Sequence, residues 1–573
     1  AEITELRYGG RPAALLRGFK AVYNGVFINC LTMAWVIAAM VKISRAFFDV
    51  PPSVVIAGCI LVSVIYTSLG GIRGVVITDL VQFSLGMIGA ILLAVFAVAH
   101  FGGIQGGGEG PGLLPELGRT LTAAGGSLDE VLAFVPSADH PTTPLIYFVA
   151  LLLFGWWRWA EGNGYIVQRL ATTRDESHAQ RAQLWFTVVH NAFRPWPWIV
   201  VGLAALVLYP ALAPVPPASL SASAGAAAIT VSPGSLDVAT GGTLTVDGAG
   251  PGWRARLFDR EMPLEPTADG RATVRFGRLP ESAVTELTLL PPNGSPAVVV
   301  PGLVVQLADR EMAYPLLMGR FLPPGLLGLV VASLLAAFMS TIDTHVNWGA
   351  SYLVQDVYRR FVRPAAGPRE CVTVSRLSIV LMALLAGGAA LLVQNIAEVW
   401  LFLITLGAGL GSVSAARWYW WRVTAWAELA AIAVSTVVAI ALLLFCTPTL
   451  FGGANPWFAL DVPRWVQIPL IALASLVTWL AVSFFGPAND EGTLRRFAER
   501  VRPPGPGWRR FRSAGTAARP MAPLVWRFVA GLGLVFGSLF GLGYLILGPW
   551  PVGLGLLAVS AVLWAWVWRP QAT

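Results

Sequence analysis

Long apolar segments dominate this sequence. Twelve of them come close to the roughly 20 residues that a helix needs to cross a bilayer. Backbone amides in lipid must bond within their own segment, and continuous apolar runs lack the alternation of barrel strands, so each segment is expected to be a helix. The predicted spans are 18–46, 52–70, 74–100, 144–165, 183–209, 322–345, 374–394, 396–416, 424–446, 465–485, 523–547 and 549–568.

The charged residues support this interpretation. They make up only 12% of the chain, about half the share of roughly 25% in soluble globular proteins. Loops on one predicted side are rich in arginine, whereas the short loops on the other side hold only Lys42, Arg45, Arg119 and Arg464. This bias predicts a cytoplasmic C-terminus. It also explains the net charge of +8 without a nucleic-acid partner, so the lipid bilayer is the expected surrounding.

One segment breaks the apolar pattern. Residues 214–308 are polar, and short β-branched runs alternate there with Gly, Pro, Asn and Asp. Such a pattern predicts six or seven strands in a small β-sandwich. Because the segment follows the fifth span, it is expected to be extracytoplasmic, either as an inert module or as one that captures a solute or a partner.

Two polar features lie inside predicted spans, where ionisable and oxygen-bearing side chains are functional candidates. Asp79 is expected either to pair with a loop arginine such as Arg73 or to lie on a cation pathway. Ala337, Ser340 and Thr341 form a small, oxygen-rich patch at helical spacing. Compact oxygen donors suit a hard cation such as sodium, although hydroxyls in helices often bond to the carbonyl four residues earlier. Both features are predicted near the cytoplasmic ends of their helices.

A third feature interrupts the fourth span, where Arg158, Glu161 and Asn163 stand among glycines. Interrupted membrane helices bind substrate in many transporters, so these residues are substrate-binding candidates. The alternative is a structural ion pair between Arg158 and Glu161, three residues apart. A glycine-rich stretch at 406–412 allows either close helix packing or local unwinding, and close packing is the favoured interpretation.

Enzymatic chemistry finds little support in the sequence. Cys30, Cys59, Cys371 and Cys446 lack CxxC spacing, and the five histidines are scattered. Free thiols are therefore expected, and no zinc site is predicted. No nucleophile–base arrangement or phosphate-binding loop is recognisable, so the protein is predicted not to be an enzyme.

Three segments, in this order, resemble the sodium:solute symporter family of sugar, proline and pantothenate carriers. They are YTSLGGIRGVVITDLVQ (66–82), YIVQRLATTRDESHAQRA (165–182) and LPPGLLGLVVASLLAAFMSTIDTHVNWGASYLVQDVYRRF (322–361). The resemblance implies a leucine-transporter-like fold of ten core helices in two inverted halves. It further implies that the chain is a fragment that starts at the third core helix and lacks the helices before it.

The resemblance also assigns roles to residues. Ala337, Ser340 and Thr341 match the eighth-helix part of the family's sodium site, whose other oxygens come from the first core helix. Asp79 matches an acidic residue linked to sodium passage, and a polar substrate contact falls near Asn163. The implied organisation is a first transporter part with core helices three to seven, the β-rich insert, the remaining transporter helices, a basic cytoplasmic loop and two final membrane helices, at 1–213, 214–308, 309–486, 487–520 and 521–573.

The predicted function is sodium-coupled symport of a small solute by alternating access, in a multi-pass protein of a bacterial inner membrane. The alternative is a sensor that uses the same fold to detect a solute without transporting it. The solute, the stoichiometry and the oligomeric state do not follow from the sequence.

Overall fold

A computed structural model of the chain describes residues 2–48, 50–69, 72–140, 143–155, 164–210, 218–224, 227–292, 295–450, 453–512 and 520–568. Among these residues, ten helical segments are long and apolar enough to cross a membrane, and two shorter apolar helices accompany them. All twelve fall on predicted spans. The two shorter ones cover Pro52–Thr67 and Leu145–Gly155, within the predictions 52–70 and 144–165.

The α-helices are α1 (Glu2–Tyr8), α2 (Gly10–Val22), α3 (Asn29–Phe47), α4 (Pro52–Leu69), α5 (Ile72–His100), α6 (Leu113–Ala123), α7 (Leu128–Leu132), α8 (Leu145–Ala150), α9 (Gly164–Leu170), α10 (Glu176–Val188), α11 (Pro195–Leu208), α12 (Ala313–Phe321), α13 (Pro324–Tyr352), α14 (Pro368–Ala390), α15 (Ile396–Tyr419), α16 (Ala425–Cys446), α17 (Arg464–Phe485), α18 (Glu491–Val501), α19 (Met521–Leu547) and α20 (Trp550–Val567). Wider π-helical turns, η1 (Tyr23–Ile28), η2 (Leu151–Gly155), η4 (Val189–Phe193) and η6 (Leu353–Val362), continue or join α-helices, and η5 (Arg310–Met312) and η7 (Pro506–Phe511) are 3₁₀ turns.

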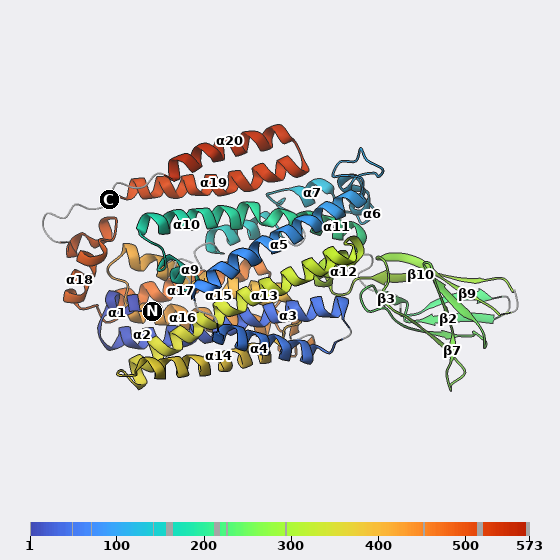
Figure 1. The fold of residues 1–573 in the computed structure, drawn as a ribbon, viewed down its shortest axis with the longest axis horizontal. Coiled ribbons are helices and arrows are strands. Elements are labelled where there is room, and N and C mark those ends of the chain that lie inside the picture. Colours follow the sequence, from blue (N-terminus) through green and yellow to red (C-terminus); the bar gives the residue numbers. More distant parts are fainter. Residues whose placement is uncertain are drawn as a thin grey trace.

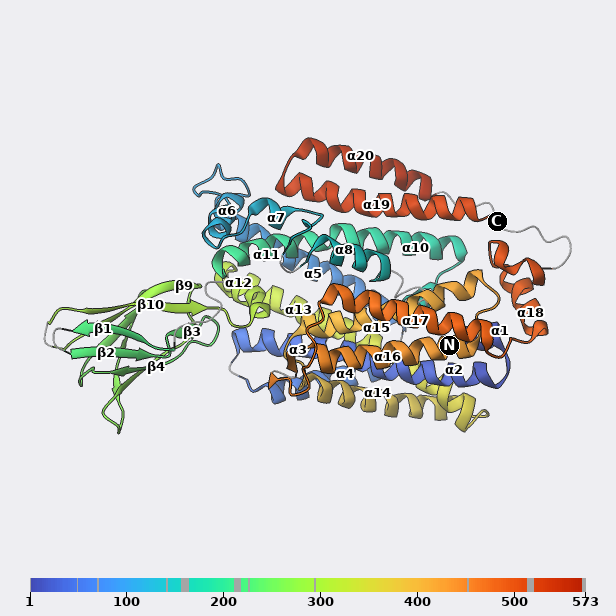
Figure 2. The ribbon, with the colours of Figure 1, turned by 180° about the vertical axis from the view of Figure 1, so that it is seen from behind.

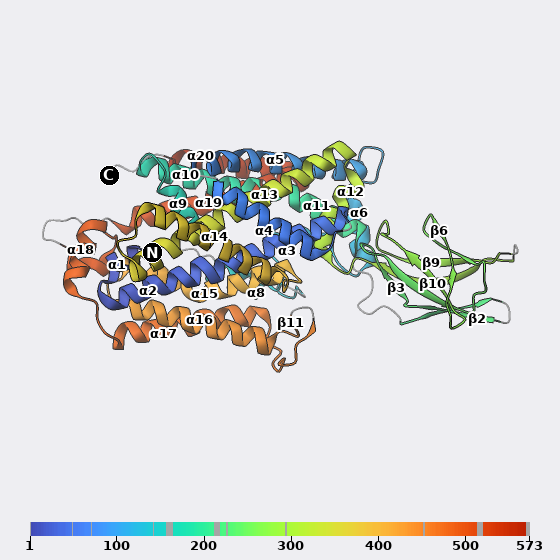
Figure 3. The same cartoon turned by 60° about the horizontal axis from the view of Figure 1, so that its bottom comes forward.

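Helix α13 lies in the middle of the bundle. It packs against α3, α4, α5 and α14, and Figure 3 shows it between α5 and α14. Helices α15, α16 and α17 pack on one another and form a group of their own, best seen from behind in Figure 2. Helices α19 and α20 form a hairpin beside α10 (Figure 1). The central position of α13 brings its polar face close to several partner helices.

The predicted close packing of the 406–412 glycines is seen at Gly409. A methyl group added there would lie 2.0 Å from the Ser435 hydroxyl of α16. In addition, the Ser475 hydroxyl of α17 donates a 2.6 Å hydrogen bond to the Gly409 carbonyl. Helix α15 continues unbroken through this stretch, so these glycines pack helices together and do not unwind one.

The polar segment forms two five-stranded sheets. The strands are β1 (Leu220–Ala224), β2 (Ala227–Ser232), β3 (Ser235–Asp237), β4 (Gly242–Asp247), β5 (Arg254–Leu257), β6 (Arg260–Pro263), β7 (Glu265–Pro266), β8 (Ala272–Phe276), β9 (Ala283–Leu290) and β10 (Val298–Gln306), and a small hairpin pairs β11 (Thr449–Leu450) with β12 (Gly453–Ala454). The sheet orders are β1-β2-β4-β8-β7 and β3-β10-β9-β5-β6. Pairing is antiparallel except between β3 and β10, and inward residues such as Leu244 and Leu287 are fully buried.

The insert thus has more strands than the six or seven predicted. The additional ones are short, such as β3 with three residues and β7 with two, and such strands carry too little alternation to be recognised in a sequence. The insert projects from one end of the helix bundle, whereas the marked chain ends lie at the other (Figure 1).

Salt bridges fix the base of the insert to the helices. The Lys42 ammonium of α3 lies 2.6 Å from the Asp309 carboxylate and 2.5 Å from the Glu311 carboxylate, just after β10. Glu311 also accepts hydrogen bonds from the backbone amides of Ile396 and Ala397 at the start of α15, at 2.9 and 3.0 Å. A carboxylate is favoured at a helix N-terminus, so Glu311 links the insert to both α3 and α15.

A buried charge cluster holds the other end of the bundle together. Glu428 of α16, only 1% exposed, accepts hydrogen bonds from Tyr8 and Lys20, and the Arg417 guanidinium lies 3.4 Å away. The cluster joins α1 and α2 to α15 and α16, and the hydrogen-bonded pairs Tyr8–Glu428 and Lys20–Glu428 are 420 and 408 positions apart.

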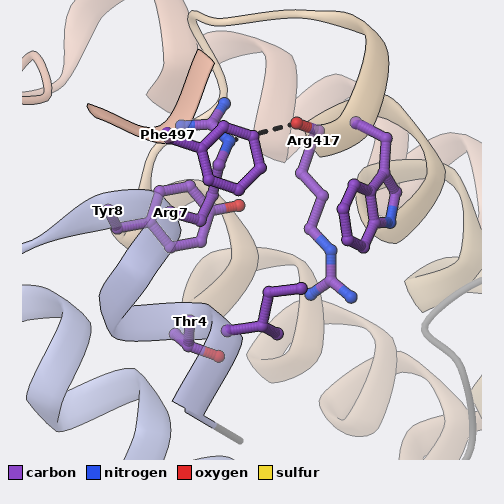
Figure 4. Close-up of a pocket in the computed structure, with 7 residues that line it drawn as sticks. Thr4, Arg7, Tyr8, Arg417 and Phe497 are labelled. Carbon is purple, nitrogen blue, oxygen red and sulfur yellow. Dashed lines mark hydrogen bonds between the residues drawn. The ribbon is translucent and has the colours of Figure 1, made fainter. Parts of the chain in front are cut away.

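Arg7 extends this clamp to the segment after α17. Its guanidinium donates to the Arg417 and Trp420 carbonyls at 3.1 and 3.0 Å and lies over the rings of Phe497 and Trp508. Figure 4 shows Arg7 beside Phe497, with its hydrogen bond to Arg417. Burial lowers the pKa of Arg7 to about 10, so the side chain stays charged at neutral pH. A small cavity of about 10 Å³ lies next to it, between Thr4, Arg417 and Phe497.

We expect Glu428→Gln to destabilise the protein by about 3–5 kcal/mol, because it leaves Lys20 and Arg417 buried without their negative partner. Thermal unfolding in detergent measures the effect. Glu109→Gln, the same change at an exposed position, is the control. Equal unfolding temperatures for the two variants would contradict the assignment of Glu428 as the centre of the clamp.

Candidate cation site

Asp79 and Ser340 meet where α5 and α13 pack together. The Ser340 hydroxyl donates a hydrogen bond to Oδ1 of Asp79. The two residues are 261 positions apart, and they lie at the same level of the bundle, as expected from the depths predicted for them. Their contact places a carboxylate directly beside the oxygen-bearing face of α13.

The second carboxylate oxygen of Asp79 is bound by Arg169 of α9. The Arg169 Nη2 atom lies 2.7 Å from Oδ2 of Asp79 and 3.1 Å from the Thr344 hydroxyl. The side chains of Asp79 and Arg169 are 21% and 32% exposed, so this ion pair is not fully enclosed by neighbouring side chains. Each oxygen of Asp79 therefore accepts one hydrogen bond, one from a hydroxyl and one from a guanidinium.

The two hydroxyls of the predicted patch behave differently. Thr341 donates to the Ala337 carbonyl at 2.9 Å, which is the common bond to the preceding helical turn that the sequence left as an alternative. Ser340 instead reaches across to α5. Ala337 is exposed and both hydroxyl residues are half-buried, so this face of α13 is not fully covered by neighbouring side chains.

The donor set suits a hard cation. Its members are the Asp79 carboxylate, the Ser340 and Thr341 hydroxyls and the Ala337 carbonyl, and all of them are oxygens. Hard cations prefer such ligands, whereas transition metals favour imidazole and thiolate. Within the part of the chain that the structure describes, no group of three or more His, Cys, Asp or Glu side chains is arranged to hold a metal ion, and the four cysteines are free.

The other predicted site residues cannot be placed. Arg158, Glu161 and Asn163 lie outside the described residues, and their role in substrate binding stays a prediction. The same holds for the alternative ion pair between Arg158 and Glu161. An arginine does bind Asp79, and it is Arg169 of α9; the side chain of Arg73 lies outside what the structure describes.

Two neighbouring polar residues were missed. Arg169 lies in the segment 165–182 that resembles the family. Nothing in the sequence indicates that it contacts Asp79, 90 residues earlier. Asp343 is an acidic residue inside an apolar helix, a signal that could have identified it. It is 1% exposed, and one of its oxygens accepts a 2.9 Å hydrogen bond from Asn347.

Known proteins that are similar to this chain indicate its family. The family model described as "Sodium:solute symporter family" matches residues 1–227 and 295–434. Asp79, Arg169 and Ser340 lie inside the matched ranges, whereas most of the β-rich insert falls between them.

Two curated relatives illustrate the similarity. The chain is 22% identical over 391 residues to a sodium/glucose cotransporter of Vibrio parahaemolyticus, covering 67% of this chain and 54% of that protein. It is 25% identical over 179 residues to a sodium/proline symporter of Haemophilus influenzae, covering 30% of this chain and 33% of that one. The chain thus spans about half, or less, of the length of these relatives.

A solved structure, the substrate-bound, outward-open state of a Na⁺-coupled sialic acid symporter, matches 85% of this chain and 77% of its own. The TM-score is 0.50 and the identity is 18%. This likeness confirms the leucine-transporter-like fold expected from the sequence, and the ten long apolar helices make the protein a multi-pass integral membrane protein.

The Asp79–Ser340 contact predicts a measurable coupling. Because removing either partner abolishes the same hydrogen bond, Asp79→Asn and Ser340→Ala together should cost less stability than the sum of the two single changes. The expected coupling energy is about 0.5–3 kcal/mol, measured by unfolding of the single and double variants. Ser333→Ala is the control, because the Ser333 hydroxyl of α13 donates to the Val330 carbonyl of the same helix. Its destabilisation should add to that of Asp79→Asn within about 0.5 kcal/mol. If the destabilisation caused by Ser340→Ala also adds to that of Asp79→Asn, Asp79 and Ser340 do not make this contact.

Proposed function

The chain belongs to the sodium:solute symporter family, and on this premise we propose that the full-length protein couples sodium entry to the uptake of a small solute by alternating access. The observation that carries the proposal is the contact of Asp79 with the hydroxyl-bearing face of α13. It joins a carboxylate from one helix to neutral oxygens from another, and such a set can replace part of the water shell of a sodium ion.

The binding step follows from these groups. Sodium would take oxygens from the Ala337 carbonyl and the Ser340 and Thr341 hydroxyls, with Asp79 beside them as the negative charge. Neutral ligands keep the affinity moderate, which a transported ion requires because it must also leave. The hydroxyls need only rotate away from their present acceptors, Asp79 and the Ala337 carbonyl.

The driving force is the sodium gradient. Each sodium ion moved across 100 mV contributes about 2.3 kcal/mol. Coupling requires sodium to bind one conformation more tightly than the other, and a tenfold preference corresponds to about 1.4 kcal/mol. The binding site sits between α5 and α13, so its occupancy can alter how these two helices pack.

The solute is assigned only as a class. The relatives named above carry glucose and proline, and we extend to this chain only that the cargo is a small polar molecule. Arg158, Glu161 and Asn163 are its proposed contacts.

The orientation in the membrane is proposed from the basic residues. The arginine-rich segment around α18 and the C-terminus face the cytoplasm, and the β-rich insert faces the outside of a bacterial inner membrane.

We expect Ser340→Ala and Thr341→Ala each to raise the sodium concentration for half-maximal uptake by about tenfold, because each removes one neutral ligand. Sodium-dependent uptake of a panel of labelled sugars and amino acids by the full-length protein measures this. Ser333→Ala makes the same chemical change on the same helix and should leave the sodium requirement unaltered. Wild-type sodium dependence in both hydroxyl variants would refute the site.

A further inference from the structure

Arg169 holds the position at which a sodium ion would meet Asp79. Its guanidinium nitrogen lies 2.7 Å from Oδ2 of Asp79, and the remaining oxygen accepts from Ser340. The guanidinium carries a positive charge and has no acceptor atom to offer a cation. A sodium ion that binds Asp79 comes close to this guanidinium, and the repulsion between the two positive charges disfavours their binding the carboxylate together.

We propose that Arg169 is a tethered competitor of sodium: the guanidinium and the ion exclude each other from the Asp79 carboxylate, so that Arg169 sets the affinity and selectivity of the site. This inference rests on the sodium site proposed above and adds to it a residue that binds no ion itself. It differs from a positioning role, in which Arg169 would orient Asp79 and thereby strengthen sodium binding.

The geometry allows the exchange. The same Arg169 nitrogen lies 3.1 Å from the Thr344 hydroxyl, so the guanidinium can release Asp79 and keep a hydrogen-bond acceptor. The ion pair is partly exposed, and such pairs contribute little net stability. A competitor of this strength weakens sodium binding without preventing it.

The exchange keeps the charges paired. Asp79 and Arg169 are one carboxylate and one guanidinium in contact. A bound sodium ion takes the place of the guanidinium as the positive partner of the carboxylate, while Arg169 stays nearby on Thr344. A larger cation would have to displace the guanidinium further, so the arrangement favours a small one.

The test is a sodium titration of the purified full-length protein at constant ionic strength, with N-methylglucamine replacing sodium and thermal unfolding as the readout. A bound ion raises the unfolding temperature according to its concentration and affinity. We expect Arg169→Gln to lower the half-saturating sodium concentration, by up to about fivefold for a pair of this exposure. Arg169→Lys keeps the charge and should lower it less. Arg174→Gln, an exposed arginine five residues away, is the matched control and should change nothing.

A second background separates competition from other effects. In Asp79→Asn the carboxylate charge is gone, so adding Arg169→Gln should leave the half-saturating sodium concentration of that variant unchanged. Suppose that wild type responds to sodium. An unchanged or higher half-saturating sodium concentration for Arg169→Gln in the wild-type background would then overturn the competitor role and leave the sodium site standing. No sodium-specific response of wild type would overturn both. If Arg169→Gln does not fold, the Arg169→Lys titration decides. A half-saturating sodium concentration below that of wild type supports the competitor role, and an unchanged or higher one overturns it.

Discussion

A carboxylate on a membrane helix needs partners, because its charge is costly wherever water is scarce. Asp79 finds them on two other helices: the Ser340 hydroxyl on α13 and the Arg169 guanidinium on α9. The need of one side chain for donors thus ties together three helices that are far apart in the sequence. The carboxylate and the hydroxyl would also help to solvate a small cation, so the contact that joins α5 to α13 also defines the proposed site.

The helical part of the fold could be predicted because the bilayer leaves few choices. Segments of about 20 apolar residues have to form helices, and their ends are marked by loops with charged residues, Gly or Pro. The short strands β3 and β7 escaped prediction because two or three residues carry no period. The small-residue stretch around Gly409 was interpreted correctly, because glycines in a membrane helix have few uses besides close packing.

The site was predictable only in part. Asp79 stood out because ionisable side chains are rare in membrane helices. Ser340 and Thr341 stood out because they lie at helical spacing with the small residue Ala337, and the helix directions placed them at the depth of Asp79. Their partners could not be derived in the same way. Many arginines lie in loops on the predicted cytoplasmic side, and nothing local distinguishes Arg169 from Arg73 as a partner of Asp79. Spacing also could not show that Thr341 bonds within its helix whereas Ser340 bonds across to α5.

Both ends of the bundle are fixed by buried or half-buried charges. Glu428 and Arg7 join the N-terminal helices to α15 and α16 at one end, and Lys42 and Glu311 join the insert to α3 and α15 at the other. Helix α15 takes part in both clamps. A motion of α15 during transport would therefore break or carry along charged contacts at each end, which ties the insert mechanically to the transport helices.

The central claim is that the oxygens beside Asp79 bind sodium. Two cryo-electron microscopy maps of the full-length protein, one in sodium and one with N-methylglucamine in its place, test it most directly. The account predicts density for an ion between Asp79 and the Ser340 and Thr341 hydroxyls in the first map only. Identical side-chain positions in both maps, with no ion and with the two hydroxyls directed at lipid, would contradict it.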